Sequence, residues 1–404
     1  MKIAFNAIRV SNRAGSGFDT FIINFVNEFA RYVYSQKLNI DFDIYTFYPQ
    51  HFPEVKKENI KQVKILFWKI AGSAAKTPNH TDTLKHKIFN QLSGLKNFLA
   101  DYLRIFWTQF VFPFLARKYD LTVALTEYDA ALFINKQMVI VHNTVPFLFP
   151  DFPTKYRFYT YQLLPKILRK CKIITVSNIL KEELVNMFSL DPQKISVVYE
   201  GVDQKIFHPA PESEIELFKK RYQIAGDYIL AVGHSHPMKN FSGVVQAFSL
   251  IRKNHKINLV IAGYADKKLP LSDGMIFLGH VPNDKLYILY SGAKCFVFPT
   301  WHEGFGLPPL EAMACGCPVV VSNRGSLPEV CGEAAIYVDP DKPENIAQEV
   351  LKVLNVLNVL NDDVVFNQMI KKGFEQAKRF SWEKTVKDFL DIFGKFSENA
   401  YLEK

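Results

Sequence analysis

Short runs of apolar and β-branched residues alternate with longer amphipathic stretches along most of the chain. In the first half these runs predict strands at Lys2–Ile8, Asp43–Phe47, Val63–Phe67, Leu121–Leu125, Met138–His142, Lys172–Val176 and Ile195–Val198. After Gly201 the pattern begins again, with strands expected at Tyr228–Val232, Asn258–Ala262, Ile276–Leu278, Cys295–Phe298, Pro318–Val321 and Ala335–Val338. Helical patterns lie between most of the runs, which indicates βαβ units and parallel sheets with helices on both faces. The sequence therefore predicts two doubly wound α/β domains.

A proline-rich segment separates the two halves of this pattern. His208-Pro-Ala-Pro-Glu precedes a charged helical stretch, so an interdomain linker is expected at about 199–212. The length of 404 residues fits two large domains, since a typical domain has roughly 150 residues. A ligand is expected in a cleft between the two domains.

Charge is distributed unevenly between the halves. The chain has 49 Lys and Arg against 40 Asp and Glu, a formal net charge of +9. Residues 1–200 carry 26 basic and 16 acidic side chains, whereas residues 201–404 carry 23 and 24. A positive surface of this kind suits nucleic acid, anionic lipid headgroups or an acidic substrate, and charge alone does not choose among them.

The cysteines and the apolar runs indicate a cellular compartment. Five cysteines, an odd number without a Cys-x-x-Cys pair, favour a reducing, cytoplasmic compartment. The amino terminus, Met-Lys-Ile-Ala-Phe-Asn, lacks the apolar core of a signal peptide. The longest apolar stretch, Ile105 to Leu115, is about half of the ~20 residues that a spanning helix needs. We therefore expect a cytoplasmic protein that does not cross a membrane.

Residues 84–118 form a basic and aromatic segment. It contains Lys85, Lys87, Lys96, Arg104, Phe106, Trp107, Phe110 and Phe112. A partly buried helix pair would explain this composition, and the alternative is a membrane-surface element. In the second case the protein would be peripheral at the inner face of an anionic membrane.

The densest chemical signal is Trp301-His-Glu-Gly-Phe-Gly-Leu-Pro-Pro-Leu-Glu-Ala-Met-Ala-Cys-Gly-Cys-Pro-Val-Val. A strand ends at Thr300, a glycine-bearing loop follows, and a helix is expected to begin near Leu307. Backbone N–H groups entering a helix after a parallel strand bind anions, so a phosphate is expected there. Glu303 in the loop and Glu311 in the helix can reach different parts of one ligand. Because carboxylates accept hydrogen bonds from sugar hydroxyls, this arrangement predicts a nucleotide sugar.

These residues also resemble a known family. Glu303-x7-Glu311 followed by Gly316-Cys-Pro-Val-Val is similar to the donor site of family-4 retaining glycosyltransferases of the GT-B fold, in particular bacterial mannosyltransferases of surface polysaccharide synthesis. The resemblance implies that Glu303 meets the transferred sugar and Glu311 the ribose. It implies that the loop between them supplies further donor contacts: Gly304, Phe305, Gly306 and Leu307.

The resemblance implies a division of the chain as well. An acceptor-binding Rossmann-like domain is expected at 1–200 and a nucleotide-sugar donor-binding domain at 201–381. A C-terminal helix at 382–404 is expected to cross back onto the first domain.

Two further motifs of the second half are family-like. Ile229-Leu-Ala-Val-Gly-His-Ser-His-Pro-Met-Lys-Asn-Phe resembles the strand and turn that offer a basic pair to the diphosphate. Lys239 matches the lysine, whereas His234 and Met238 stand where arginines are common. Fewer cationic side chains are therefore expected to neutralise the diphosphate than in many relatives. Ile276-Phe-Leu-Gly-His-Val-Pro resembles the strand and turn that hold the nucleobase, through backbone groups near His280 and Val281, and leaves the base open.

Two features of the first half join the expected site. Met138-Val-Ile-Val-His-Asn-Thr puts His142 at a strand end and resembles the family's histidine that faces the sugar and phosphate. Ala14-Gly-Ser-Gly-Phe-Asp resembles the family's glycine-rich loop over the donor phosphate, with Gly15 and Gly17. Thr20 occupies the third glycine position of a dinucleotide fingerprint, which argues against a dehydrogenase.

No metal and no cofactor is expected apart from the donor substrate. Asp41/Asp43 and Asp339/Asp341 have Asp-x-Asp spacing, but one pair lies at a strand entrance and the other in a proline-containing loop. Neither pair has a nucleotide loop nearby.

Together the motifs predict a retaining hexosyltransferase that uses a GDP- or UDP-linked sugar and a glycan or lipid-linked acceptor. Mannose from GDP-mannose is the first expectation, because Pro237-Met-Lys-Asn resembles the turn of bacterial mannosyltransferases, and UDP-glucose stays open. His142, Lys239 and Glu303 are expected to serve catalysis, which rests on positioning and charge stabilisation. A nucleotide-sugar epimerase of similar fold and a basic nucleic-acid-binding protein are the alternatives. No recognised nucleic-acid motif interrupts the sheets, so no nucleic acid is expected as a partner.

Overall fold

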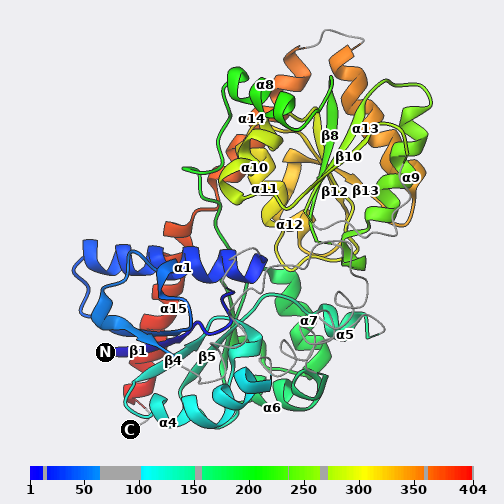
Figure 1. Ribbon diagram of the computed structural model, residues 1–404. Helices are drawn as coiled ribbons and strands as arrows, with labels where there is room; N and C mark the ends of the chain where they lie inside the picture. The colour runs from blue at the N-terminus through cyan, green and yellow to red at the C-terminus, as the bar shows by residue number, and fades with distance from the viewer. Residues whose placement is uncertain are drawn as a thin grey trace, which may run out of the picture. The chain divides into compact units, whose positions relative to one another are not determined.

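The computed structural model describes residues 1–11, 16–63, 102–150, 157–234, 236–263, 272–358 and 363–402. The chain forms two compact units (Figure 1). One comprises Met1–Val141, Thr154–Ile174 and Leu190–Ile195, and the other comprises His142–Pro153, Thr175–Ser189 and Ser196–Lys404. Two short pieces of the first half of the chain thus belong to the second unit. The roles expected for the domains and the crossing of the last helix stay predictions.

Within the described residues, the first sheet has seven strands in the order β3-β2-β1-β4-β5-β6-β7. Neighbouring strands from β3 to β5 pair in parallel. The strands are β1 (Lys2–Asn6), β2 (Asp41–Thr46), β3 (Ile60–Gln62), β4 (Leu121–Ala124), β5 (Gln137–Val141), β6 (Lys172–Thr175) and β7 (Ile195–Val197). The helices that connect them are α1 (Gly17–Ser35), α4 (Phe112–Ala116), α5 (Val145–Leu148), α6 (Leu164–Leu168) and α7 (Asn178–Phe188).

Alternation along β1 and β2 buries both faces of this sheet. On one face Phe5 and Phe42 pack against Phe29 of α1, with ring centroids 4.9 and 5.2 Å from that of Phe29. On the other face a cluster with Ala4, Tyr45, Trp107 and Phe112 covers the same strands from the opposite side. The predicted parallel sheet with helices on both faces is confirmed for this unit.

In the part of the chain that the structure describes, the second sheet has six strands in the order β10-β9-β8-β11-β12-β13, and every neighbouring pair is parallel. The strands are β8 (Tyr228–Val232), β9 (Asn258–Ala262), β10 (Met275–Gly279), β11 (Cys295–Phe298), β12 (Val319–Ser322) and β13 (Ala335–Val338). The helices are α8 (Glu212–Arg221), α9 (Phe241–Arg252), α10 (Asn283–Gly292), α11 (Leu307–Ala314), α12 (Leu327–Cys331), α13 (Pro343–Asn358), α14 (Asp363–Lys378) and α15 (Trp382–Leu402). Helices α9 and α13 cover one face, and α10, α11 and α14 lie on the other (Figure 1).

Short helical turns complete the description. The 3₁₀ turns are Pro49–His51, Lys57–Asn59, Glu127–Asp129, Pro192–Lys194, Pro237–Lys239 and Gly332–Ala334. Two π-helical turns, Trp107–Val111 and Tyr159–Leu163, lead directly into α4 and α6. Each of these helices has a proline, Pro113 or Pro165, near its start.

The third strand lies just before the predicted run, most of which falls outside the described residues. The sequence favoured Val63–Phe67, whereas β3 spans Ile60–Gln62 at the end of the sheet order. Among the described strands, β3 pairs with β2 only, and its residues Lys61 and Gln62 are polar, so hydrophobicity does not reveal this edge strand. Residues 64–67 lie outside the described residues.

Two sequence expectations bear on the membrane and on the thiols. None of the described helices is both long and apolar enough to cross a lipid bilayer. All five cysteines are buried free thiols: Cys171, Cys295, Cys315, Cys317 and Cys331. Burial raises the pKa of Cys171, Cys295 and Cys331 to about 12.

Candidate functional site

The predicted donor residues gather at the carboxyl edge of the second sheet. His234 lies two residues beyond the end of β8, and His280 directly follows β10. The loop with Glu303 follows β11. Because all these strands are parallel, their carboxyl ends open at one edge of the sheet, where ligands of such folds bind.

A close backbone approach shapes this edge. Gly263, at the end of β9, has φ +107°, and a Cβ on it would lie 2.1 Å from the carbonyl oxygen of Gly233. The N–H of Gly233 donates to the carbonyl of Ala262, and that of Gly263 donates to the carbonyl of Gly279. Only glycine fits at position 263, which holds the ends of β8, β9 and β10 together.

Lys239 and Glu303 form the central ion pair of the site. Lys239 Nζ lies 2.6 Å from Glu303 Oε1, and the two side chains are 22% and 15% exposed. The same ammonium lies 5.0 Å from the ring centroid of Phe298, the last residue of β11. Burial, followed by the charge of Lys239, lowers the pKa of nearby His236. The pair places one cation and one anion at the carboxyl edge.

Contacts on both sides fix the backbone of the Glu303 loop. The N–H of Trp301 donates to the carbonyl of Met238 at 3.0 Å. Ser326 donates twice to the carbonyl of Glu303, from its N–H at 3.2 Å and its hydroxyl at 3.0 Å. Gly306 has φ +108°, which lets the loop turn into α11 without the strain that another residue would bear. The Glu303 loop is thereby tied to the turns that follow β8 and β12.

Glu311 lies deeper, between α11 and α10. Its Oε2 accepts a hydrogen bond from the hydroxyl of Tyr290 in α10 at 3.0 Å. Burial raises the pKa of this carboxyl to about 7, and the Tyr290 hydrogen bond opposes that change. Burial therefore favours the protonated form of this carboxyl.

His142 belongs to the second unit and meets the Glu303 loop there. Its Nδ1 shares a hydrogen bond of 2.9 Å with Glu200 Oε1, and both residues are buried. A Cβ on Gly304 would lie 1.8 Å from the carbonyl oxygen of His142, so position 304 must be glycine. Ser177 donates to the carbonyl of Gly304 at 2.7 Å. The structure thus brings together His142, Gly304 and the neighbouring Glu303.

Glu183 of α7 links two of these segments. One of its oxygens accepts from the hydroxyl of Thr144, and the other lies 2.8 Å from Nε2 of His302. Thr144 lies two residues after His142, and His302 directly precedes Glu303. Glu183 therefore holds both segments by one carboxylate.

The remaining predicted residues lie in different surroundings. His234 and His280 are exposed, whereas Val281, Phe305 and Leu307 are buried. Gly17 is the first residue of α1 in the other unit, and a Cβ there would meet nothing within 4 Å. Gly15 lies outside the described residues.

Cations already engage both Asp-x-Asp pairs. Lys2 lies 3.2 Å from Asp41, and Lys61 lies 3.2 Å from Asp43. Arg324 Nη2 lies 3.1 Å from Asp339 and 2.6 Å from Asp341. Across the described part of the chain, no group of three or more His, Cys, Asp or Glu side chains is arranged to hold a metal ion.

Sequence reasoning missed the partners of the predicted residues. Glu200, Glu183, His302 and Tyr290 each contact a predicted residue or its loop. His302 had a signal, because it lies beside Glu303 within the motif. Glu183 had none, since it is one of two adjacent carboxylates on an amphipathic helix and lies 119 residues from His302 in sequence.

Sequence comparison matches the second half of the chain to one family. The profile of the family described as "Glycosyl transferases group 1" matches residues 214–361. O-antigen chain mannosyltransferase B of Escherichia coli is 31% identical over 275 residues, which cover 64% of this chain and 70% of that protein. O-antigen chain mannosyltransferase RfbU of Salmonella typhimurium is 32% identical over 226 residues, which cover 54% of this chain and 60% of that protein.

Structural comparison extends over nearly the whole chain. Sucrose-phosphate synthase of Thermosynechococcus elongatus has a TM-score of 0.68 at 18% identity, covering 99% of this chain and 100% of its own. Anabaena HepE in complex with UDP-glucose has a TM-score of 0.68 at 15% identity, covering 98% and 100%. The predicted fold class, GT-B with two Rossmann-like domains, is confirmed.

Proposed function

The chain belongs to the glycosyl transferases group 1 family and is a glycosyltransferase. On that premise, we propose that it transfers mannose from GDP-mannose to a glycan or lipid-linked acceptor, with retention of the anomeric configuration. The Lys239–Glu303 pair at the carboxyl edge of the second sheet is the observation that carries this proposal. The names of the two O-antigen mannosyltransferases support mannose as the sugar. UDP-linked sugars remain the competing donors, because HepE is described in complex with UDP-glucose.

The proposal gives the ion pair two partners in the bound state. Lys239 would turn its ammonium to the diphosphate, where charge-assisted hydrogen bonds are strong. Glu303, released from Lys239, would accept hydrogen bonds from hydroxyls of the transferred sugar. The ion pair would thus keep both groups at the carboxyl edge until a ligand carries the compensating charges.

The start of α11 offers few donors for the phosphates. Four backbone N–H groups at a helix start usually lack a partner within the helix. Here two of these four positions are Pro308 and Pro309, which have no N–H, so Gly306 and Leu307 supply the donors that remain. Lys239 would therefore supply most of the positive charge that neutralises the diphosphate, since His234 and Met238 replace the arginines expected nearby.

Retention needs no protein nucleophile in this proposal. The departing diphosphate would accept the proton of the acceptor hydroxyl on the same face of the sugar, and the C1–oxygen bond would form as the C1–phosphate bond breaks. Protein groups would position the two substrates and stabilise the leaving charge. Glu200 would orient the ring of His142 toward the sugar by holding Nδ1.

A donor panel tests the proposal. GDP-mannose, UDP-glucose, UDP-galactose and ADP-glucose are each added to the purified protein, and the melting temperature is measured. A donor at 100 times its dissociation constant stabilises the fold by roughly 2.7 kcal/mol, so the true donor should stand out. Transfer is then measured with lipid-linked acceptor, and the anomeric configuration of the product is read by NMR. Conversion of the donor sugar without acceptor would instead favour an epimerase.

We also propose peripheral binding to an anionic membrane through the first unit. Four aromatic side chains repeat every four residues along the helical segment 102–116: Tyr102, Phe106, Phe110 and Phe114, here called the aromatic stripe. They are 57%, 55%, 62% and 67% exposed. Phe133, also exposed, continues the surface beside Phe110, with ring centroids 6.5 Å apart.

Charge complementarity favours an anionic lipid surface as the occupant of the stripe. Residues 102–118 contain Arg104, Arg117 and Lys118 and no acidic residue. The guanidinium of Arg117 lies 5.0 Å from the ring centroid of Phe114, so a cation and an apolar group are presented together. Aromatic and basic side chains in this combination bind the headgroup region of bilayers. The expected contributions of Lys85, Lys87 and Lys96 lie outside the described residues.

A further inference from the structure

Asn240 occupies a demanding place beside the central ion pair. It directly follows Lys239 and precedes α9, and its backbone is left-handed, with φ 51° and ψ 41°. The side chain is buried, with the residue only 3% exposed. Asparagine adopts this backbone conformation more readily than most residues, and its short amide can bond to nearby backbone.

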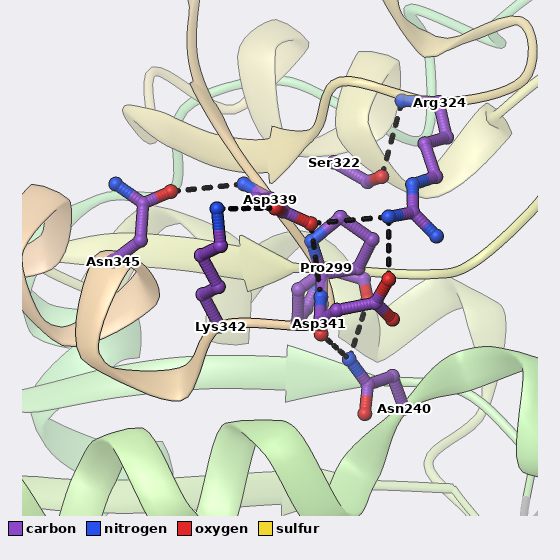
Figure 2. A network of polar contacts seen from close by, with 9 residues as sticks. Asn240, Pro299, Ser322, Arg324, Asp339, Asp341, Lys342 and Asn345 are labelled. Atoms are coloured by element: carbon purple, nitrogen blue, oxygen red, sulfur yellow. Dashed lines mark hydrogen bonds and ion pairs between the residues drawn. The ribbon is translucent and has the colours of Figure 1, made fainter.

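Both ends of the Asn240 amide are fully engaged. Oδ1 accepts a hydrogen bond of 3.1 Å from the N–H of Gly243 and so caps α9. Nδ2 donates to the carbonyl of Pro299 at 3.0 Å and to that of Pro340 at 2.7 Å. Pro299 follows β11 and Pro340 lies two residues after β13, so one amide joins the turns after three strands (Figure 2).

The loop that receives this amide is itself firmly held. Pro340 lies between Asp339 and Asp341, and both of these carboxylates accept from Arg324 (Figure 2). Asp339 also accepts from Lys342 at 3.3 Å, and its N–H donates to Asn345 at 2.9 Å. The N–H of Asp341, followed by Lys342, lowers the pKa of Asp339, so its carboxylate stays ionised.

The connections continue to Glu303. Arg324 is followed by Gly325, where φ is +60° and a Cβ would lie 2.9 Å from the backbone nitrogen and oxygen of Glu303. Ser326 comes next and donates to the carbonyl of Glu303. A closed ring of contacts therefore runs from Lys239 through Asn240, the β13 loop and the β12 turn to Glu303.

We propose that Asn240 is a positioning residue for sugar transfer, which sets the place of Lys239 relative to Glu303 by tying the Pro237–Lys239 turn to the strand ends. The inference rests on the proposed function, because that function gives Lys239 and Glu303 their roles. The lysine side chain is long and has many rotamers, so its reach depends on a fixed Cα. Asn240 fixes that Cα through the neighbouring peptide.

A capping role alone does not account for Asn240. Capping uses Oδ1 only, and Asp or Ser would serve a helix start about equally well. The Nδ2 group is what only asparagine supplies here, and it satisfies two buried carbonyl oxygens. The two roles can therefore be separated by one substitution.

The test is Asn240→Asp. The introduced carboxylate still caps α9, but it presents oxygen to the carbonyls of Pro299 and Pro340, so the tie is replaced by repulsion. Repulsion should displace Lys239 from its place beside Glu303. A misplacement of about 1 Å in a catalytic site can cost about 10²-fold in rate, so we expect kcat/KM for the donor to fall by about 10- to 100-fold. Protonation of the introduced carboxyl restores one hydrogen-bond donor. The difference in kcat/KM between this variant and wild type should therefore become smaller as pH falls from 8 to 5.

Two companion variants sharpen the result. Gln246→Glu makes the same chemical change at an exposed position of α9 and should leave activity within twofold. Gly243→Ala keeps Asn240 but adds a Cβ that would lie 2.7 Å from both Nδ2 and Oδ1 of the Asn240 side chain. Alanine favours helix by about 1 kcal/mol over glycine, so lower activity here would report displacement of the amide and not loss of helix.

The outcomes are distinct. Folded Asn240→Asp and Gly243→Ala proteins that both have reduced kcat/KM, with a loss that depends on pH in the first, support the proposal. Folded Asn240→Asp protein with activity within twofold of wild type at pH 8 overturns it, and so does failure of both variants to fold. Failure of the proposed function is seen separately, as wild-type protein that transfers sugar from no donor.

Discussion

At the scale of single residues, the titratable groups of the candidate site already have protein partners. Lys239 is paired with Glu303, His142 with Glu200, and Glu311 with Tyr290. A buried charge left without such a partner would cost several kcal/mol, so these pairings stabilise the fold around the candidate site. On the proposed function, binding would exchange a protein partner for a ligand group of the same charge.

Replacement of the two glutamates should separate turnover from nucleotide binding. Glu303→Ala removes the proposed contact with the transferred sugar, and loss of one such transition-state contact can cost about 10²–10³ in rate. Glu311→Ala should instead weaken binding of the free nucleoside diphosphate more than it slows saturated turnover. The measurements are kcat with excess donor and calorimetric titration with GDP. Equal loss of nucleotide affinity in both variants contradicts this division.

The pKa of Glu311 predicts a pH-dependent stability. Burial raises the pKa of this carboxyl from 4.5 to about 7, so the folded chain binds a proton that the unfolded chain has lost. Its contribution to the free energy of unfolding therefore decreases as pH rises from 4.5 to 7. Glu311→Gln removes this titration, so the variant should gain up to about 3 kcal/mol over wild type at pH 8 and little at pH 5.

Urea unfolding at the two pH values measures the difference. Glu375→Gln, at an exposed position of α14, is the matched control and should shift neither curve. A gain from Glu311→Gln that is equal at both pH values would show that the titration belongs to another group.

The sequence could nominate residues for the candidate site but not their partners. Glu303 and Glu311 lie eight residues apart in one motif, so local spacing made them candidates. His142 directly follows β5 and Glu200 lies three residues after β7, so the two residues meet although they are 58 positions apart in sequence. Such a pairing depends on the packed fold, which no local pattern encodes.

At the scale of elements, the apolar runs predicted most strand bounds of the second sheet accurately. β8, β9, β11 and β13 have the predicted bounds, because strands covered on both faces are apolar throughout. The π-helical turn before α4 had no such signal. Pro113 lacks an N–H and would crowd the carbonyl of a preceding helical turn, and the extra residue of the π-helical turn relieves this conflict.

The start of α1 gives a test at this scale. Ser16 and Asp19 form a capping box, and Asp19 also accepts from the N–H and hydroxyl of Ser11. Ser16→Ala should lower the free energy of unfolding by about 1 kcal/mol, the usual contribution of a serine cap. Ser35→Ala, at the exposed other end of the helix, should have a smaller effect. Equal melting temperatures for wild type and Ser16→Ala would contradict the cap.

At the scale of the whole molecule, charge and exposed aromatic surface are concentrated in the first half of the chain. The excess of basic side chains is confined to residues 1–200. The aromatic stripe lies within this half, and large exposed apolar patches usually mark an interaction site. The sequence indicated the composition of the segment, but only the fold shows that Trp107 and Phe112 turn inward while the stripe turns outward.

Vesicle binding tests the stripe. Wild-type protein should sediment with vesicles that contain phosphatidylglycerol, and less so as salt rises, since each basic residue near the surface contributes about 1 kcal/mol before screening. Phe106→Ser, Phe110→Ser and Phe114→Ser combined should abolish binding and spare hydrolysis of the donor. Leu217→Ser, at an exposed apolar position of α8, should change neither. If wild-type protein does not bind the vesicles at low salt, a protein is the better candidate for the partner that covers the aromatic stripe.

The buried thiols give each unit its own reporter of opening. Cys171 lies in the first unit, and the other four cysteines lie in the second. Thiolate, not thiol, reacts with alkylating reagents, and burial both shields these groups and suppresses their ionisation. Pulsed alkylation followed by peptide mass spectrometry would therefore give an opening rate for the unit with Cys171 and another for the unit with Cys295 and Cys331. Donor added to the protein should slow labelling in the second unit first, so the ligand can be followed without any engineered probe.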